Sequence, residues 1–215
     1  MNAGILTCSS LEEFVRRAQE RAGTDHPVYT LDKRYHVEPK DMRAVILERL
    51  SSLSARHDTL LVAMGFCGGS WDQVVAPCRI VLPRVDDCVT LLLQRGDGYC
   101  ANLKQLGHLY IYEEDPSQSL MFRVGEDVDE ELAGELIELY FANYHHLDII
   151  DTGLTDCYSE AYVERAQAEA DRLGLTLDYV PGGIRLLEKL VTGAWDEQFL
   201  VAEPGHRIRH GDFFD

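Results

Sequence analysis

The sequence predicts an α/β protein of three layers, in which crossover helices connect the strands of one or more mostly parallel sheets. Three observations support this prediction. Short apolar runs alternate with helix-like periodic segments from one end of the chain to the other. Connections that contain a helix join parallel strands, because antiparallel neighbours need only a short turn. The chain has 215 residues, 46% of them hydrophobic, which is enough to bury a complete core.

The first part of the chain contains four strand segments with helices between or after them. Glu12 and Glu13 suit the first turn of a helix, and Gly23 is placed to end it. Pro39 suits the first turn of the second helix, and Asp87 suits the start of the third. The expected strands are 4–7, 27–31, 60–66 and 79–83, and the expected helices are 9–22, 39–53 and 89–93.

The second part continues the alternation after an acidic segment, 113–127, which is typical of a hinge or a boundary. His145 and His146 are expected to end a long helix and to cap its carbonyls rather than to bind metal. The basic run 206–210 is expected to be a solvated end. The expected strands are 108–112, 147–152, 177–180 and 199–202, and the expected helices are 129–144, 158–173 and 184–191.

Domain organisation stays open between two interpretations. One is a single α/β domain over residues 1–215 with a single sheet. The other is a pair of similar lobes, 1–115 and 128–205, that face each other across a cleft.

Composition excludes some classes of function. The chain has 37 acidic and 20 basic residues and a formal net charge of -17, so nucleic acid and anionic membranes are poor partners. The amino terminus lacks a signal peptide, and no apolar run has the ~18 residues that span a bilayer. We therefore expect a cytoplasmic protein whose six cysteines are reduced.

Four side chains that can bind metals follow the first four strands. Cys8, His36, Cys67 and Cys88 each stand near or just beyond the end of a strand. Because the carboxyl ends of parallel strands meet at one edge of a sheet, we expect these side chains to gather there. Three thiolates and one imidazole would complete a tetrahedral zinc site, whereas the three cysteines alone would hold three irons of an iron–sulfur cluster. Cys78 begins a strand and is expected in the core.

The same stretch also allows a catalytic interpretation. Residues 65–70 are similar to a strained nucleophile turn, in which Cys67 would attack a substrate and adjacent amides would form an oxyanion hole. His36 is the best-placed candidate for the base. This interpretation predicts a thiol-dependent enzyme.

Cofactor contacts are expected around the same edge. Gly68 and Gly69 could cradle a phosphate, although they match no established phosphate-binding motif. Arg84 could hold an anion or pair with Asp86 and Asp87, and Asp87 is itself a candidate for cofactor contact.

Several segments together resemble the uncharacterised bacterial and archaeal family filed as domain-of-unknown-function family 1638. Cys8, Cys67 and Cys88 fall on cysteines of that family's pattern, although Asp86 stands where relatives tend to carry histidine. The segments that resemble the family are CGGSWDQV, PRVDDCVTLLL with GDGY, FANYHHLDIIDTG and GAWDEQFLVAEPGHRI.

The resemblance implies a metabolic role, a cofactor and a partner for the chain. Relatives are often encoded beside corrinoid-dependent methyltransferases and their iron–sulfur activators in anaerobes. It therefore implies an accessory protein of corrinoid-dependent methyl transfer or one-carbon metabolism, with zinc, an iron–sulfur cluster or a corrinoid as cofactor. The expected partner is a corrinoid protein or its methyltransferase.

Overall fold

The computed structural model describes residues 2–119 and 128–215, which fold into two compact units. Unit 1 is formed by Met1–Leu103 together with Ile184–Asp215, and unit 2 is formed by Lys104–Gly183. Unit 1 therefore consists of two segments that are separated in the sequence by the whole of unit 2. Residues 120–127 of the acidic segment lie outside the described residues.

Unit 1 is built on a five-stranded sheet with the order β2-β1-β3-β4-β8. The first four strands are parallel, and β8 pairs antiparallel with β4 at the edge. The chain passes from β1 to β2 on one side and then returns across β1 to β3 on the other side. The strand order therefore reverses between β1 and β3, which is where open α/β sheets usually bind ligands. The strands are β1 (Ala3–Cys8), β2 (Val28–Leu31), β3 (Thr59–Ala63), β4 (Arg79–Pro83) and β8 (Phe199–Ala202).

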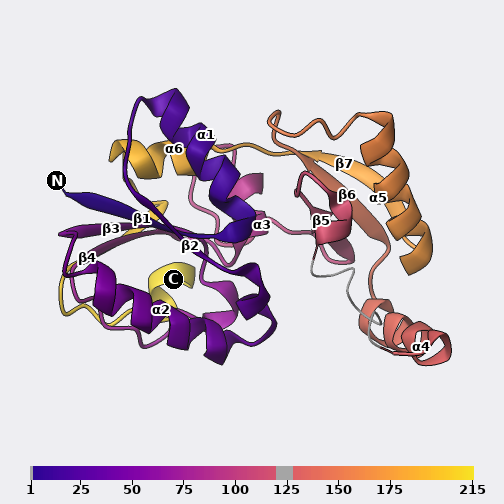
Figure 1. Ribbon diagram of the computed structural model, residues 1–215, viewed down its shortest axis with the longest axis horizontal. Coiled ribbons are helices and arrows are strands. Elements are labelled where there is room, and N and C mark those ends of the chain that lie inside the picture. Colours follow the sequence, from indigo (N-terminus) through magenta and orange to yellow (C-terminus); the bar gives the residue numbers. More distant parts are fainter. Residues whose placement is uncertain (1, 120–127) are drawn as a thin grey trace. The chain divides into compact units, whose positions relative to one another are not determined.

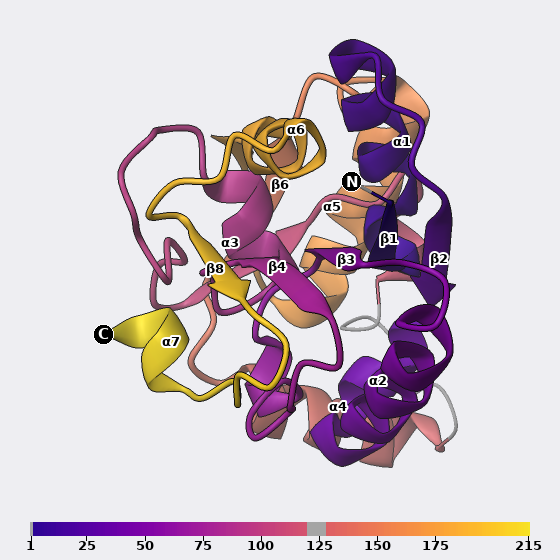
Figure 2. The same cartoon turned by 90° about the vertical axis from the view of Figure 1, so that its left-hand side faces the viewer.

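Helices cover both faces of this sheet. Figures 1 and 2 show α1 and α6 on one face and α2 and α7 on the other, which gives unit 1 its three layers. Gly23 ends α1 in the left-handed conformation at φ 66°, as the sequence predicts. The helices are α1 (Glu12–Ala22), α2 (Pro39–Leu53), α3 (Cys88–Leu93), α6 (Arg185–Thr192) and α7 (Gly211–Phe214), with short 3-10 helices η1 (Ser9–Leu11), η2 (Lys33–Val37) and η3 (Cys67–Gly69).

The C-terminal segment completes the core of unit 1. In α6, Leu186, Leu187 and Leu190 are fully buried, and this helix packs against α1, β3 and β4. Ile208 and Phe213 are also fully buried. In the basic run 206–210 itself, the basic residues are exposed, as expected of a solvated end. Ile208 is the exception, since it is buried and its amide donates to the carbonyl of Val74.

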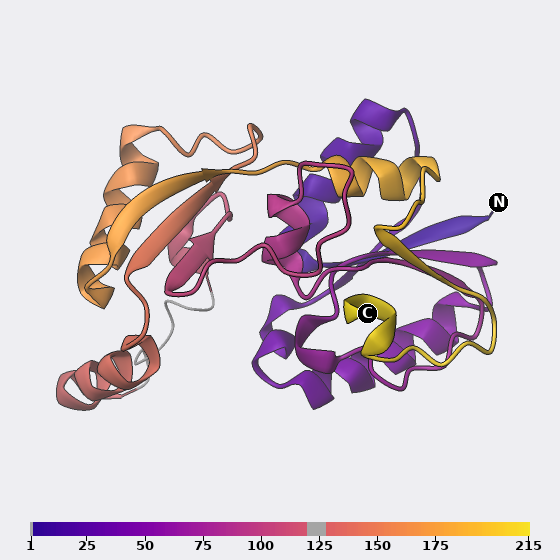
Figure 3. The same cartoon turned by 180° about the vertical axis from the view of Figure 1, so that it is seen from behind.

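Unit 2 is a smaller parallel sheet with helices. The strand order is β5-β6-β7, and Figure 3 shows α5 beside β6 and β7. Apolar residues of all three strands, such as Leu109, Leu147 and Leu177, pack with Tyr162 and Ala166 of α5. The elements are β5 (His108–Ile111), η4 (Pro116–Gln118), α4 (Glu130–Phe141), β6 (His146–Asp151), α5 (Glu160–Leu173) and β7 (Thr176–Pro181).

The predicted fold class is confirmed, since both sheets are mostly parallel and are flanked by helices. In the part of the chain that the structure describes, the strands form two sheets rather than one. Within residues 2–119 and 128–215, none of the helices has the length and apolar character needed to cross a lipid bilayer.

Truncating Leu187 tests the role of the returning segment. Leu187→Ala should lower the free energy of unfolding by about 2–5 kcal/mol, because it leaves a cavity between α6 and the sheet. Leu47→Ala in α2 is the control, since Leu47 is half exposed, and it should cost less than about 1 kcal/mol. Denaturant unfolding measures both. Equal losses would show that α6 is not part of the core of unit 1.

Candidate functional site

Two loops of unit 1 lie side by side beyond the carboxyl ends of β3 and β4. The amide of Phe66 donates to the carbonyl of Val85 at 2.9 Å, and the amide of Cys67 donates to the carbonyl of Asp86 at 2.7 Å. These bonds continue the contact between the two strands into the loops that follow them. The loop that carries Cys67 is therefore fixed against the loop that leads to Cys88.

Gly65 permits this close approach. A Cβ atom at this position would lie 2.6 Å from the Cα and 2.7 Å from the amide nitrogen of Asp87. Real Cβ atoms do not come so near to backbone atoms, so only glycine fits unless a loop moves.

Cys67 has an unusual backbone conformation. Its φ is 46°, in the left-handed region that residues other than glycine rarely adopt, and Gly68 and Gly69 follow with φ of 64° and 88°. Arg43 of α2 donates to the carbonyl of Gly69 at 2.8 Å. Residues held in such strained backbone conformations cluster at functional sites, so the φ of Cys67 marks it as a candidate functional residue.

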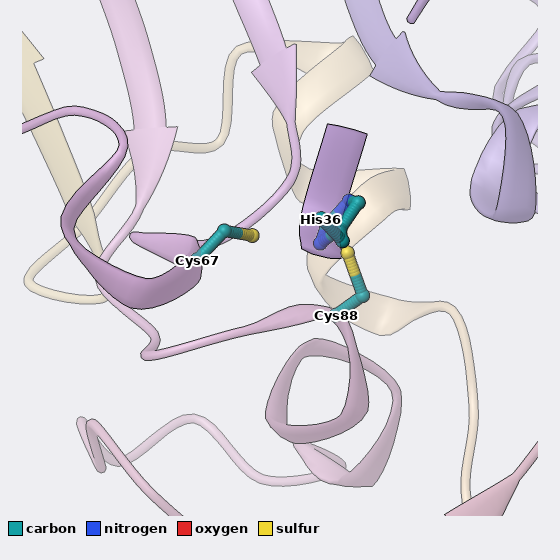
Figure 4. Close-up of side chains that lie close together, drawn as sticks. All are labelled: His36, Cys67 and Cys88. Carbon is teal, nitrogen blue, oxygen red and sulfur yellow. The ribbon is translucent and has the colours of Figure 1, made fainter. Parts of the chain in front are cut away.

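Three of the four predicted metal ligands are brought together. A ring nitrogen of His36 and the sulfurs of Cys67 and Cys88 all lie within 4.8 Å of one another. Figure 4 shows both sulfurs directed toward the side where the His36 ring lies. Both cysteines are buried, and the Nε2 atom of His36 is buried without a hydrogen-bond partner among the described residues.

The environment favours the neutral forms of these side chains. Burial lowers the pKa of His36, although the nearby Asp87 carboxylate opposes this effect, so the imidazole is neutral at pH 7. A hydrogen bond with Cys67 raises the pKa of Cys88 well above its ordinary value, and burial raises it further. A backbone hydrogen bond from Gly65 acts in the opposite direction. A bound cation that displaced the thiol protons would offset the cost of burying the resulting thiolates.

Cys8 does not join the three-residue group. It is still part of β1, where it pairs with Leu31, whereas Cys67 and Cys88 stand beyond the ends of their strands. Its sulfur accepts a hydrogen bond from the Ser10 hydroxyl at 3.2 Å. Burial and the charge of Cys88 raise the pKa of Cys8 to about 11, so the two thiols are close enough to interact. Cys78, predicted to be a core residue, is buried.

The candidate cofactor residues have structural partners. The Arg84 guanidinium donates to the carbonyls of Asp212 at 2.8 Å and Glu197 at 3.2 Å, and it stacks over the Tyr99 ring at 4.1 Å. These contacts hold the C-terminal segment. Asp87 caps α3 by accepting from the amide of Thr90 at 3.0 Å.

Three amides around the Cys67 turn already donate to backbone carbonyls. The amide of Cys67 donates to Asp86, and the amides of Gly69 and Ser70 both donate to the carbonyl of Phe66. These three amides are therefore used within the loops.

Sequence reasoning missed Arg43 and one group of polar residues in unit 2. Arg43 lies in the middle of α2, and no motif marks it as a neighbour of the Gly69 turn. His146 begins β6 instead of capping a helix, and it lies within 4.8 Å of His108 and Asp148 in unit 2. The alternation of the polar residues His146 and Asp148 with apolar residues along one strand is the signal that could have indicated the group in unit 2.

Substitution of Gly65 tests the close approach of the two loops. Gly65→Ala should lower the free energy of unfolding by about 1–3 kcal/mol, because the new methyl group must displace the backbone of Asp87. Gly96→Ala is the control, since a Cβ there would meet nothing within 4 Å, and it should change stability by less than about 0.5 kcal/mol. Denaturant unfolding distinguishes them. An unchanged Gly65→Ala variant would contradict the described loop packing.

The raised pKa of Cys8 predicts that the free energy of unfolding falls at alkaline pH. In the metal-free protein the unfolded chain loses this thiol proton near pH 9, whereas the folded chain keeps it until about pH 11. The contribution of this thiol to the free energy of unfolding is complete below pH 9. Between pH 9 and pH 11 it is lost, and the free energy of unfolding falls by up to about 3 kcal/mol. Cys8→Ala should make the decline of unfolding free energy between pH 9 and pH 11 less steep. Parallel curves for the variant and the wild type would contradict this burial effect.

Comparisons with known proteins identify the family. The family described as Protein of unknown function (DUF1638) matches residues 30–191, a segment that contains His36, Cys67 and Cys88. No curated protein matches the chain, and no solved structure matches it. Because the match covers most of the sequence, the chain belongs to the DUF1638 family.

Proposed function

We propose that the protein binds a divalent metal ion through His36, Cys67 and Cys88 in unit 1. The observation that carries this proposal is the buried Nε2 atom of His36, which has no hydrogen-bond partner in the part of the chain that the structure describes. It belongs to a ring of which one nitrogen lies within 4.8 Å of the Cys67 and Cys88 sulfurs. A buried polar atom without a partner costs free energy. A metal ion bound by this nitrogen would remove that cost.

The donor set fits zinc best. Two thiolates and one imidazole are typical zinc ligands, and tetrahedral bonds place such ligands roughly 3.5–4 Å apart, which small side-chain movements here would reach. An iron–sulfur cluster needs more thiolates, and Cys8, the third candidate, is outside the group. Three protein ligands leave one position for an exogenous ligand, as in catalytic zinc sites.

The protein's own residues would prepare this site. Gly65 brings the two cysteine loops together, and the strained backbone of Cys67 directs its thiol toward Cys88. The neutral imidazole of His36 keeps a lone pair available. When bound, zinc would supply a positive charge that stabilises both thiolates and polarises a fourth ligand.

The family resemblance is the basis for proposing a metabolic role for this site. We propose a cytoplasmic accessory protein of corrinoid-dependent methyl transfer or one-carbon metabolism, whose partner is a corrinoid protein or its methyltransferase. The support for this part is the resemblance to proteins encoded beside such enzymes. An open metal position close to thiols is compatible with a role in handling a cofactor or a methyl acceptor.

The left-handed backbone of Cys67 favours a second candidate, a thiol-dependent enzyme with His36 as base. Selective alkylation of Cys67 distinguishes the two candidates. Protection of Cys67 by bound zinc supports the metal site, whereas fast alkylation of Cys67 in zinc-loaded protein, with loss of an activity, supports the enzyme.

Metal analysis of anaerobically purified protein tests the leading proposal. Wild-type protein should hold about one zinc ion per chain at this site, and Cys67→Ser, Cys88→Ser and His36→Gln should each lower zinc affinity at least about tenfold. Cys100→Ser is the control, because Cys100 is only partly buried and its thiol donates to the carbonyl of Asn102 instead. An absorption spectrum of the same sample reports bound corrinoid. Unchanged zinc affinity in all three site variants would refute the proposal.

A further inference from the structure

Four polar side chains share one face of the three-stranded sheet in unit 2. Side chains alternate between faces along a strand, so His146 and Asp148 of β6 point to the same face. The register pairs His146 with His108 of β5, and Asp148 with Asp178 of β7. Leu147 lies between them in sequence and packs in the apolar cluster on the opposite face.

These side chains form two diagonal pairs. The Nδ1 atom of His108 lies 2.8 Å from Oδ2 of Asp148, and the Nδ1 atom of His146 lies 2.8 Å from Oδ2 of Asp178. The two imidazole rings stack with their centroids 4.3 Å apart and their planes 10° apart. Nitrogen and oxygen donors from three adjacent strands are thus gathered in one small region.

Asp148 lacks an interaction that its burial requires. Only 1% of its side chain is exposed, and while Oδ2 pairs with His108, Oδ1 has no hydrogen-bond partner within residues 2–119 and 128–215. A buried carboxylate oxygen without a donor or a cation is costly.

The donor atoms are arranged as ligands of one ion would be. One atom each from His108, His146 and Asp148 lies within 4.8 Å of the other two. A nitrogen and an oxygen 2.8 Å apart match two ligands of a shared ion, because bonds of about 2.0–2.2 Å place neighbouring ligands about 3 Å apart. Two imidazoles and one carboxylate suit zinc, iron(II), manganese, cobalt or nickel.

We propose that unit 2 holds a second divalent transition-metal site, formed by His108, His146 and Asp148, with Asp178 orienting His146. The site has no thiol ligand and lies entirely within Lys104–Gly183. The histidine side chains are 19% and 38% exposed, so an ion can enter from solvent and keep a position for water or substrate. This proposal stands independently of the site in unit 1.

Cobalt(II) titration of a variant without the thiol ligands tests the proposal. In Cys67→Ser/Cys88→Ser protein, one cobalt equivalent should still bind, and its spectrum should lack the intense near-ultraviolet band that thiolate ligands give. Adding His108→Gln and His146→Gln should abolish this binding. Adding His145→Gln instead is the matched control, since His145 is exposed and outside the group, and binding should persist.

Two further measurements keep the test decisive if a variant fails to fold. Asp178→Asn changes a half-exposed residue and should weaken cobalt binding about 10–100-fold while preserving the fold. In wild-type protein, cobalt should shift and broaden the ring-proton NMR signals of His108 and His146 before those of His145. The proposal is overturned if the thiol-free variant binds no cobalt, or if binding is the same with and without His108 and His146. In either case the two histidine–aspartate pairs serve only to join the strands.

Discussion

The hydrogen bonds that run beyond β3 and β4 are the constraint on which the site in unit 1 depends. Cys67 begins η3 and Cys88 begins α3, so each thiol follows a different loop beyond a strand. The bonds from Phe66 to Val85 and from Cys67 to Asp86 hold the loops in register, and Gly65 lets their backbones touch. The position of each cysteine is thus set by main-chain geometry, which tolerates less variation than side-chain packing does.

Much of this arrangement follows from sequence pattern alone. Apolar runs bounded by turn residues predict the strands, and the rule that parallel strands share one carboxyl edge predicts that His36, Cys67 and Cys88 lie together, as they do. Cys8 differs because β1 continues through it, so its sulfur stays outside the three-residue group although it is close enough to Cys88 to interact. Pattern alone does not fix a strand end to one residue.

Other features depend on contacts that are distant in sequence. The run Phe199–Ala202 reads as one more crossover strand, but it returns to the first sheet and pairs antiparallel with β4. The histidines at 145 and 146 follow an apolar helical pattern that extends to Tyr144, yet α4 ends at Phe141 and His146 opens a strand. In both places the local pattern was compatible with two structures, and tertiary pairing selected one.

The position of unit 2 within the sequence of unit 1 has a consequence for biosynthesis. A ribosome releases β4 and its loop long before β8, because all of Lys104–Gly183 lies between them. Until then the amide of Arg84 lacks its acceptor at Gln198, and its guanidinium lacks the carbonyl of Asp212. The loop that leads to Cys88 therefore gains these hydrogen bonds only after the segment 184–215 has been synthesised. Unit 2 can fold first during synthesis, while the thiols of unit 1 reach their final geometry only when the end of the chain has emerged.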